Sequence, residues 1–501
     1  MKKILSIILS LVLIFTMALP IFAADAVNQT CPTIYVHGFD GSKICEDKND
    51  LSTAYTFPAT DELLEPVKKK LLPALLAYIA SGNGDSFAYE LCEIVNTAFS
   101  GYFNNADGTA KGNSGAYMGY PKADSIKTTS NLTFSYDWRG DPFVIAKELN
   151  DFINYVTASS GSQKVALRCH SLGSVIATTY LTVYGNDKIM GIVFDSPALY
   201  GITYIGELLC GNPEVAGDAL LKGLKDLLGE NEYNNLIAST LDILSVAGIT
   251  DDAASFLNEL LQKTAPILYK ETLVPLFVHW PVAWAMAPDM YIDEAMNYIF
   301  TNYCSGEEYD VLKSKIEKYN NDVRKFKSET LKAFDNVGRM AVIARYGYAA
   351  LPVSPSWNVL TDTVVDTKSA SLGAETALVG TSFSDDHLAG KDMSLISPDR
   401  TVDASTCLFP EKTWFIKNSK HNRTDITFPL HHAILFGENE ATTETHTLSR
   451  FMIFDAETET LSEDKNEYKE PVKETETTSL LLKLMRFFTS IFDFIANLFK
   501  K

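Results

Sequence analysis

Short apolar runs separated by long helical stretches constrain the fold of this 501-residue chain more than any other feature. Each run is rich in apolar, β-branched or aromatic residues, is mostly bounded by turn formers, and has the length of one buried strand. The stretches between the runs repeat leucines, alanines and charges at helical spacing. This alternation predicts an α/β fold, with a mostly parallel central sheet flanked by helices. The predicted strands are 33–36, 132–136, 165–167, 190–194, 340–344 and 414–416.

Two helix-rich insertions interrupt the main domain, which we place at residues 25–455. The first, residues 51–121, separates the first two predicted strands. The second, residues 200–335, follows the fourth strand and is predicted to be a helical cap. Substrate pockets in such sheets open at the carboxyl ends of the strands, so inserted helices there would cover a site.

Both ends of the chain differ from the main domain. Residues 1–24 have the pattern of a signal peptide: Lys2 and Lys3, a long apolar run and then small residues, which predicts export. Residues 456–478 are polar and acidic and are predicted to be a linker. Residues 479–501 predict an amphipathic helix, which would dock on the domain, on a second copy, or in a membrane interface.

Charge and cysteine content exclude several classes of protein. The net charge of −20 should repel nucleic acid, so no nucleic-acid partner is expected. Seven cysteines are too few for a disulfide scaffold, although Cys31 and Cys45 could close a small loop. No histidine pair has ligand spacing beside a cysteine cluster, and no loop has EF-hand spacing, so neither metal nor cofactor is expected.

The most specific motif is the segment Cys169 to Gly173, Cys-His-Ser-Leu-Gly. It follows a predicted strand and leads into a helix-compatible stretch, which is the context of a nucleophile elbow. A turn this tight needs small flanking residues, and Cys169 and Gly173 are small. Ser171 would then be the nucleophile, and the amide of Leu172, at the start of the helix, would face a developing oxyanion.

A second motif, His37 to Gly41, directly follows the first predicted strand. Its glycines allow the backbone to turn, so that the amide of Phe39 can act as the second oxyanion donor. A strand followed by such a loop, upstream of an elbow, is typical of the α/β-hydrolase fold. The sequence therefore predicts that fold, with the helical insertion and cap added to it.

A serine nucleophile in this fold needs a histidine after the last strand and a carboxylate from an earlier loop. His421 follows the strand 414–416 and is the candidate base, with His431 and His432 as alternatives. Asp362 follows the penultimate strand and is the candidate acid. Asp399 is the alternative acid.

Three segments together resemble one family of this fold: Tyr136 to Arg139 (Tyr-Asp-Trp-Arg), the elbow, and Asp362 to Ser369. They look like the lecithin:cholesterol acyltransferase and lysosomal phospholipase group in the lipase branch of the α/β hydrolases. Thr363 stands where that group usually has Gly or Asp, and Val364 where it has Thr. The resemblance implies hydrolysis or transfer of lipid acyl esters through a serine acyl-enzyme, without a metal.

The expected function is therefore that of a secreted serine esterase acting on lipid esters. One alternative is a cell-surface binding module that keeps the scaffold without activity. The other is a peptidase or carbohydrate esterase of the same fold, since pocket shape determines the substrate and the sequence does not show it.

Overall fold

The computed structural model describes residues 29–56, 66–220, 249–466 and 468. Its centre is an eight-stranded sheet with the order β12-β11-β10-β7-β6-β5-β1-β4, in which all ladders are parallel except β11 with β12. The six predicted strands are all present in it. Their bounds are β1 Thr33–Val36, β4 Asn131–Phe134, β5 Val165–His170, β6 Ile189–Asp195, β7 Arg339–Tyr346 and β10 Thr413–Lys417.

Two further strands, β11 (Phe451–Asp455) and β12 (Thr460–Glu463), extend the sheet beyond β10. The prediction that 414–416 is the last strand was therefore wrong, and the predicted linker 456–478 begins too early, because β12 lies within it. β12 is an edge strand that pairs on one side only, so it can be built from polar residues such as threonine, serine and glutamate. This polar composition is why the segment resembles a linker in the sequence. The signal peptide 1–24 and the C-terminal helix 479–501 lie outside the described residues.

The sheet is buried on both faces, which explains why its strands read as continuous apolar runs. Leu167 and Ile192 face one core, while Ala166 and Val193, their neighbours in sequence, face the other. Within the described residues, α5 (Pro142–Ser160), α6 (Leu172–Tyr184) and α14 (Lys327–Asp335) cover the first face, and α17 (Phe428–Phe436) covers the second.

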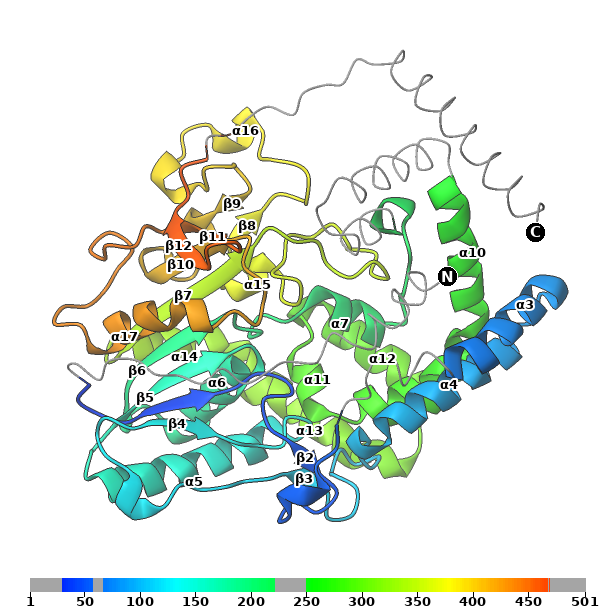
Figure 1. The fold of residues 1–501 in the computed structure, drawn as a ribbon, viewed down its shortest axis with the longest axis horizontal. Helices are drawn as coiled ribbons and strands as arrows, with labels where there is room; N and C mark the ends of the chain where they lie inside the picture. The colour runs from blue at the N-terminus through cyan, green and yellow to red at the C-terminus, as the bar shows by residue number, and fades with distance from the viewer. Residues whose placement is uncertain (1–28, 57–65, 221–248, 467, 469–501) are drawn as a thin grey trace.

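The insertion and the cap form a helical layer beside the sheet (Figure 1). In Figure 1, α3, α4 and α10 lie together at the right, away from the strands, and α4 packs directly on α10. The cap is shorter than the predicted 200–335, because α14 packs on α6 and β7 and so belongs to the sheet layers. The helices of this layer are α3 Leu72–Ser81, α4 Asp85–Phe99, α7 Thr203–Leu209, α10 Ile249–Leu268, η5 Tyr269–Val278, α11 Pro281–Ala285, α12 Ile292–Asn302 and α13 Asp310–Asp322.

Smaller elements complete the described chain. Two short antiparallel pairs, β2 (Ile44–Cys45) with β3 (Gly115–Ala116) and β8 (Glu375–Thr376) with β9 (Val402–Asp403), lie outside the main sheet. All seven cysteines are free thiols, so the loop that Cys31 and Cys45 could have closed does not form. No helix among the described residues is both long and apolar enough to cross a membrane.

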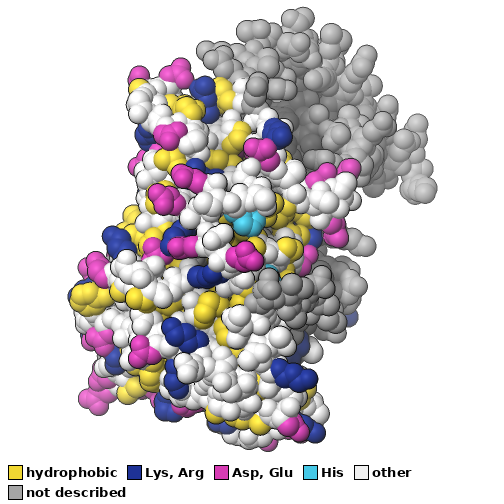
Figure 2. Space-filling view, turned by 90° about the vertical axis from the view of Figure 1, so that its left-hand side faces the viewer, with side chains coloured by type: hydrophobic (Ala, Val, Ile, Leu, Met, Phe, Trp, Pro, Cys, Tyr) yellow, Lys and Arg dark blue, Asp and Glu magenta, His cyan; other side chains and the backbone are white. Residues whose placement is uncertain are grey.

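The surface carries charges of both signs. On the face shown in Figure 2, lysine and arginine side chains are interspersed with aspartate and glutamate, and the hydrophobic side chains lie in small groups. This face therefore presents no continuous basic area.

Candidate active site

Ser171 sits in the sharp turn between β5 and α6, with φ 52° and ψ −121°. A non-glycine residue rarely adopts positive φ, so the turn stores strain that the surrounding contacts must balance. The Ser171 N–H donates to the carbonyl of Asp195 at 3.1 Å, which fixes the turn against the end of β6. This is the strand, turn and helix arrangement that the sequence predicted for Ser171.

The turn brings α6 against the end of β1. A Cβ atom added at Gly173 would clash with the carbonyl oxygen of Val36 and lie 2.8 Å from that of His37. A Cβ at Gly38 would lie 2.8 Å from the Cβ of Ser171. Both positions require glycine because the neighbours are backbone atoms or the Cβ of Ser171. The predicted oxyanion loop and the predicted elbow are therefore in direct contact.

Aromatic side chains brace the loop from His37 to Ser42. The ring of Tyr136 stacks on His37 at 4.2 Å, and its hydroxyl donates to the His37 carbonyl at 2.5 Å. The indole of Trp138 donates to the Ser42 carbonyl at 3.0 Å and packs against Phe39 at 4.1 Å. The Tyr-Asp-Trp-Arg motif thus positions the loop that carries Phe39.

The two charged residues of the same motif anchor it to the insertion. The Arg139 guanidinium is buried and makes a bidentate ion pair with Asp137, at 2.9 and 2.7 Å. It also donates to the carbonyl of Gly101 at 3.1 Å, near the end of the helical insertion. The motif therefore connects the loop from His37 to Ser42 with the helices beside it.

Asp362 and His421 form a buried pair. The His421 Nδ1–H donates to Asp362 Oδ2 at 2.7 Å, and the His421 N–H donates to the Asp362 carbonyl at 2.9 Å. The amides of Val364 and Val365 donate to Asp362 Oδ1, at 3.0 and 2.7 Å. Although burial alone would raise it, His421 and these amides hold the pKa of Asp362 below its usual value.

Thr363, next to Asp362, has φ 88°, a conformation that favours glycine. It is the position where the resembled family usually has Gly or Asp. A hydrogen bond from the Thr363 N–H to Thr361 Oγ1, at 3.0 Å, helps to hold this backbone. The departure in sequence therefore leaves the turn that presents Asp362 in place.

The Asp362–His421 pair lies next to the elbow. The His421 ring is 4.6 Å from that of His170, the residue that precedes Ser171. The Nδ1–H of His421 is hydrogen bonded to Asp362, so Nε2 is the ring nitrogen that can accept a proton. In the described structure Ser171 Oγ and His421 are not hydrogen bonded to each other.

The alternative residues are engaged elsewhere. Asp399 makes an ion pair with Lys417 at 2.9 Å and accepts hydrogen bonds from Ser397 and Thr401. His431 is bonded to Asp195 at 2.9 Å, and His432 lies beside Phe436 on α17. The geometry thus pairs His421 with Asp362 next to His170, the neighbour of Ser171, and pairs neither Asp399, His431 nor His432 with Asp362 or His421.

Two buried histidines beside the elbow are neutral. Burial lowers the pKa of His37 to about 4 and that of His170 to about 3. Each donates its Nδ1–H to a carbonyl, His37 to Gly38 at 2.6 Å and His170 to Asp195 at 3.0 Å. His37 Nε2 also accepts a hydrogen bond from the Ser42 hydroxyl at 2.5 Å, so both rings are held by hydrogen bonds to their neighbours.

An apolar cavity of about 350 Å³ lies under the helical layer and includes Phe39 in its wall. Helices α4, α7 and α10 and the η5 segment supply most of the other lining residues. Representative ones are Leu91, Val95, Leu261, Ala265, Leu273 and Phe277. The sequence predicted helices over the site. It did not predict the cavity, because the cavity lies between two insertions that are far apart in the chain.

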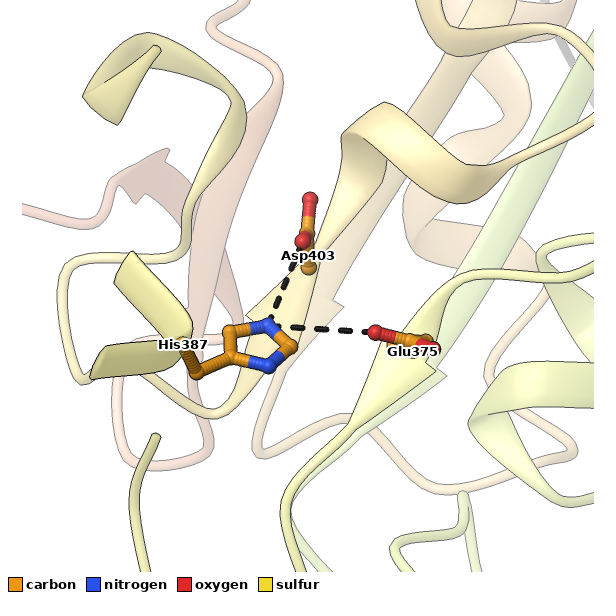
Figure 3. Close-up of side chains that lie close together, drawn as sticks. All are labelled: Glu375, His387 and Asp403. Atoms are coloured by element: carbon orange, nitrogen blue, oxygen red, sulfur yellow. Dashed lines mark ion pairs between the residues drawn. The ribbon is translucent and has the colours of Figure 1, made fainter. Parts of the chain in front are cut away.

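One cluster among the described residues has the chemistry of metal ligands: Glu375, His387 and Asp403 (Figure 3). His387 Nε2 is 3.4 Å from Asp403 Oδ2 and 3.8 Å from Glu375 Oε2. The Lys391 ammonium lies 2.8 Å from the same Nε2 and also contacts Asp403. The Lys391 ammonium thus already lies against two of the three candidate ligands and offsets one of the two carboxylate charges, and we assign no metal to the cluster.

Comparison with known proteins adds no identification: no family model matches this sequence, and no curated protein matches it.

The close approach of α6 to β1 predicts the effect of Gly173→Ala. The added methyl group meets backbone that cannot move without disturbing β1, so we expect a loss of about 3 kcal/mol in the free energy of unfolding, measured by urea denaturation. Gly119→Ala is the control, because its new Cβ would meet only the partly exposed ring of Tyr117. Equal losses in both variants would contradict the assigned packing.

The neutral buried histidines predict a pH dependence of stability. In the unfolded chain their pKa is about 6.5, so between pH 6.5 and about 4 the unfolded state binds more protons than the folded state. Stability should fall as the pH drops through this window, by about 1 kcal/mol per histidine at pH 5.5. In the His170→Gln variant, the difference in stability between pH 7.5 and pH 5.5, measured from urea midpoints, should be smaller by the contribution of one histidine. An unchanged dependence would show that His170 is not neutral in the folded protein.

Proposed function

We propose that the protein is a serine hydrolase that cleaves carboxylic esters, with Ser171 as nucleophile, His421 as base and Asp362 as the acid that orients His421. The buried hydrogen bond between His421 and Asp362, beside a strained elbow that carries Ser171, is the observation that supports this most strongly. The strand order and the chain order Ser, Asp, His also agree with an α/β-hydrolase fold.

In the proposed reaction His421 Nε2 takes the proton of the Ser171 hydroxyl as the oxygen attacks the ester carbonyl. Asp362 fixes the tautomer of His421 and stabilises the imidazolium that forms. Leu172 is the first residue of α6, so its N–H has no acceptor within the helix and can donate to the oxyanion. The Phe39 amide is the second donor. His421 then returns the proton to the leaving alcohol, and water releases the acid.

Lipid esters are the proposed substrates, because the cavity that adjoins Phe39 has almost wholly apolar walls. A cavity of this kind binds an acyl chain by removing its surface from water. This agrees with the resemblance to the lipase branch of the α/β hydrolases. Export through residues 1–24 and membrane-surface binding through residues 479–501 are part of the same proposal and rest on the sequence alone.

Replacing Ser171 by Ala tests the proposal most directly. Loss of the nucleophile should reduce kcat for ester hydrolysis by on the order of a millionfold while leaving the melting temperature within a few degrees. The wild-type protein should also react with a fluorophosphonate probe at Ser171, detected by mass spectrometry. A folded wild-type protein that neither labels nor hydrolyses esters would indicate the inactive binding module.

The cavity predicts a dependence on acyl-chain length. Ala265→Phe places a ring in the cavity and should lower kcat/KM for a palmitate ester at least tenfold, with little change for a butyrate ester. Ala253→Phe, on the exposed side of the same helix, is the matched control. A parallel loss for both esters, or none for palmitate, would place the acyl chain elsewhere. Activity confined to peptide bonds would favour a peptidase, and activity confined to esters of sugars would favour a carbohydrate esterase.

A further inference from the structure

Arg345, the penultimate residue of β7, is a fully buried arginine between the segments of the proposed active site. Ile343, two residues earlier, pairs with Asp195 at the end of β6. Side chains two apart point to the same side of a strand, so Arg345 and Asp195 both face the layer that contains α17. Their side chains meet there in a buried ion pair, with Arg345 Nη2 at 3.2 Å from Asp195 Oδ2 and Nη1 on Oδ1.

Asp195 connects this ion pair to the elbow. In the ladder between β5 and β6 it pairs with His170. Its carbonyl accepts the Ser171 N–H at 3.1 Å and His170 Nδ1–H at 3.0 Å. Its carboxylate also accepts hydrogen bonds from Thr427 at 2.6 Å and His431 at 2.9 Å. Arg345 and His431 hold the pKa of Asp195 well below its usual value, against the opposing effect of burial.

The same guanidinium also holds the segment that carries His421. Arg345 Nε donates to Ser419 Oγ at 3.1 Å, two residues before His421. Arg345 Nη2 donates to the carbonyl of Arg423 at 2.9 Å, two residues after it. The histidine is therefore held from both sides along the chain.

A third contact reaches the loop of Asp362. The hydroxyl of Thr367 donates to the backbone carbonyl of Arg345 at 3.0 Å. Thr367 follows Asp366, whose carboxylate accepts the N–H of Thr203 at the start of α7. The acid loop is thus tied both to Arg345 and to the first helix of the cap.

We propose that Arg345 is a positioning residue for the hydrolase: its guanidinium fixes the elbow and the His421 segment relative to each other, next to the Asp362 loop that its backbone carbonyl holds. This inference rests on the proposed function. A buried ion pair contributes little net stability, because desolvation offsets its attraction. Its effect on catalysis can be much larger, since a displacement of about 1 Å in a catalytic group can cost roughly a hundredfold in rate.

The test compares kcat, KM and melting temperature of variants, with an ester substrate and the complete chain. Arg345→Lys keeps the charge but loses the fork that reaches Asp195, Ser419 and Arg423 together. We expect kcat to fall about a hundredfold with KM changed less than about threefold. The rate of fluorophosphonate labelling of Ser171 should fall in parallel.

Milder variants keep the proposal falsifiable if Arg345→Lys does not fold. Ser419→Ala removes one contact of the guanidinium and should lower kcat roughly three- to tenfold. Thr413→Val is the matched control, because it removes one buried hydroxyl hydrogen bond at the opposite end of β10. It should leave kcat unchanged.

A double-mutant cycle separates positioning from general stability. If Ser419 acts through Arg345, Ser419→Ala should cost nothing further in the Arg345→Lys protein. Equal kcat losses in Ser419→Ala and Thr413→Val, or a folded Arg345→Lys protein with wild-type kcat, would overturn the proposal. An inactive wild-type protein would instead overturn the proposed function, so the two failures are distinguishable.

Discussion

The approach of α6 to the end of β1 is the constraint on which the candidate site depends. Gly173 lies against the carbonyl of Val36, so the helix can begin directly behind the strand that leads to the loop of Phe39. Because the helix starts there, the turn before it must take up the strain seen at Ser171. The same contact sets the distance between the elbow and Gly38, and hence the position of Phe39. One missing side chain thus determines the relation of two loops that are far apart in sequence.

Buried polar groups fix the other segments of the candidate site, which the contact between α6 and β1 does not position. Asp362, Asp195 and Arg345 are all removed from water, which is unfavourable unless each is paired. Each has partners from more than one segment, so the burial cost is offset only when the segments are correctly placed. Buried polar groups of this kind make the relative placement of these segments specific. The apolar cores on the two faces of the sheet supply most of the stability.

The helical layer has a different relation to the site. Helices α4 and α10 come from separate insertions and meet over an apolar cavity that includes Phe39 in its wall. Among the described residues neither insertion donates a hydrogen bond to the Asp362–His421 pair itself, although Thr203 of α7 donates to Asp366 in the same loop. The helices that line the cavity can therefore vary in sequence without replacing either residue of that pair, as is common where loops and insertions surround a constant sheet.

The sequence by itself determined the six core strands, the turn at Ser171 and the loop at Phe39, because these are local patterns of apolar runs, glycines and small residues. It also placed Asp362 and His421 after the strands that lead to them, by chain order alone. It could not exclude Asp399 as the acid or His431 as the base, because the residues next to an aspartate or a histidine in sequence do not show which partner its side chain contacts. Only the tertiary structure paired Asp399 with Lys417 and His431 with Asp195. It also placed Arg345, which lies just beyond the predicted strand 340–344, among groups between 22 and 150 residues away along the chain. Contacts of this kind depend on which strands become neighbours, and that is settled by the packing of the whole sheet.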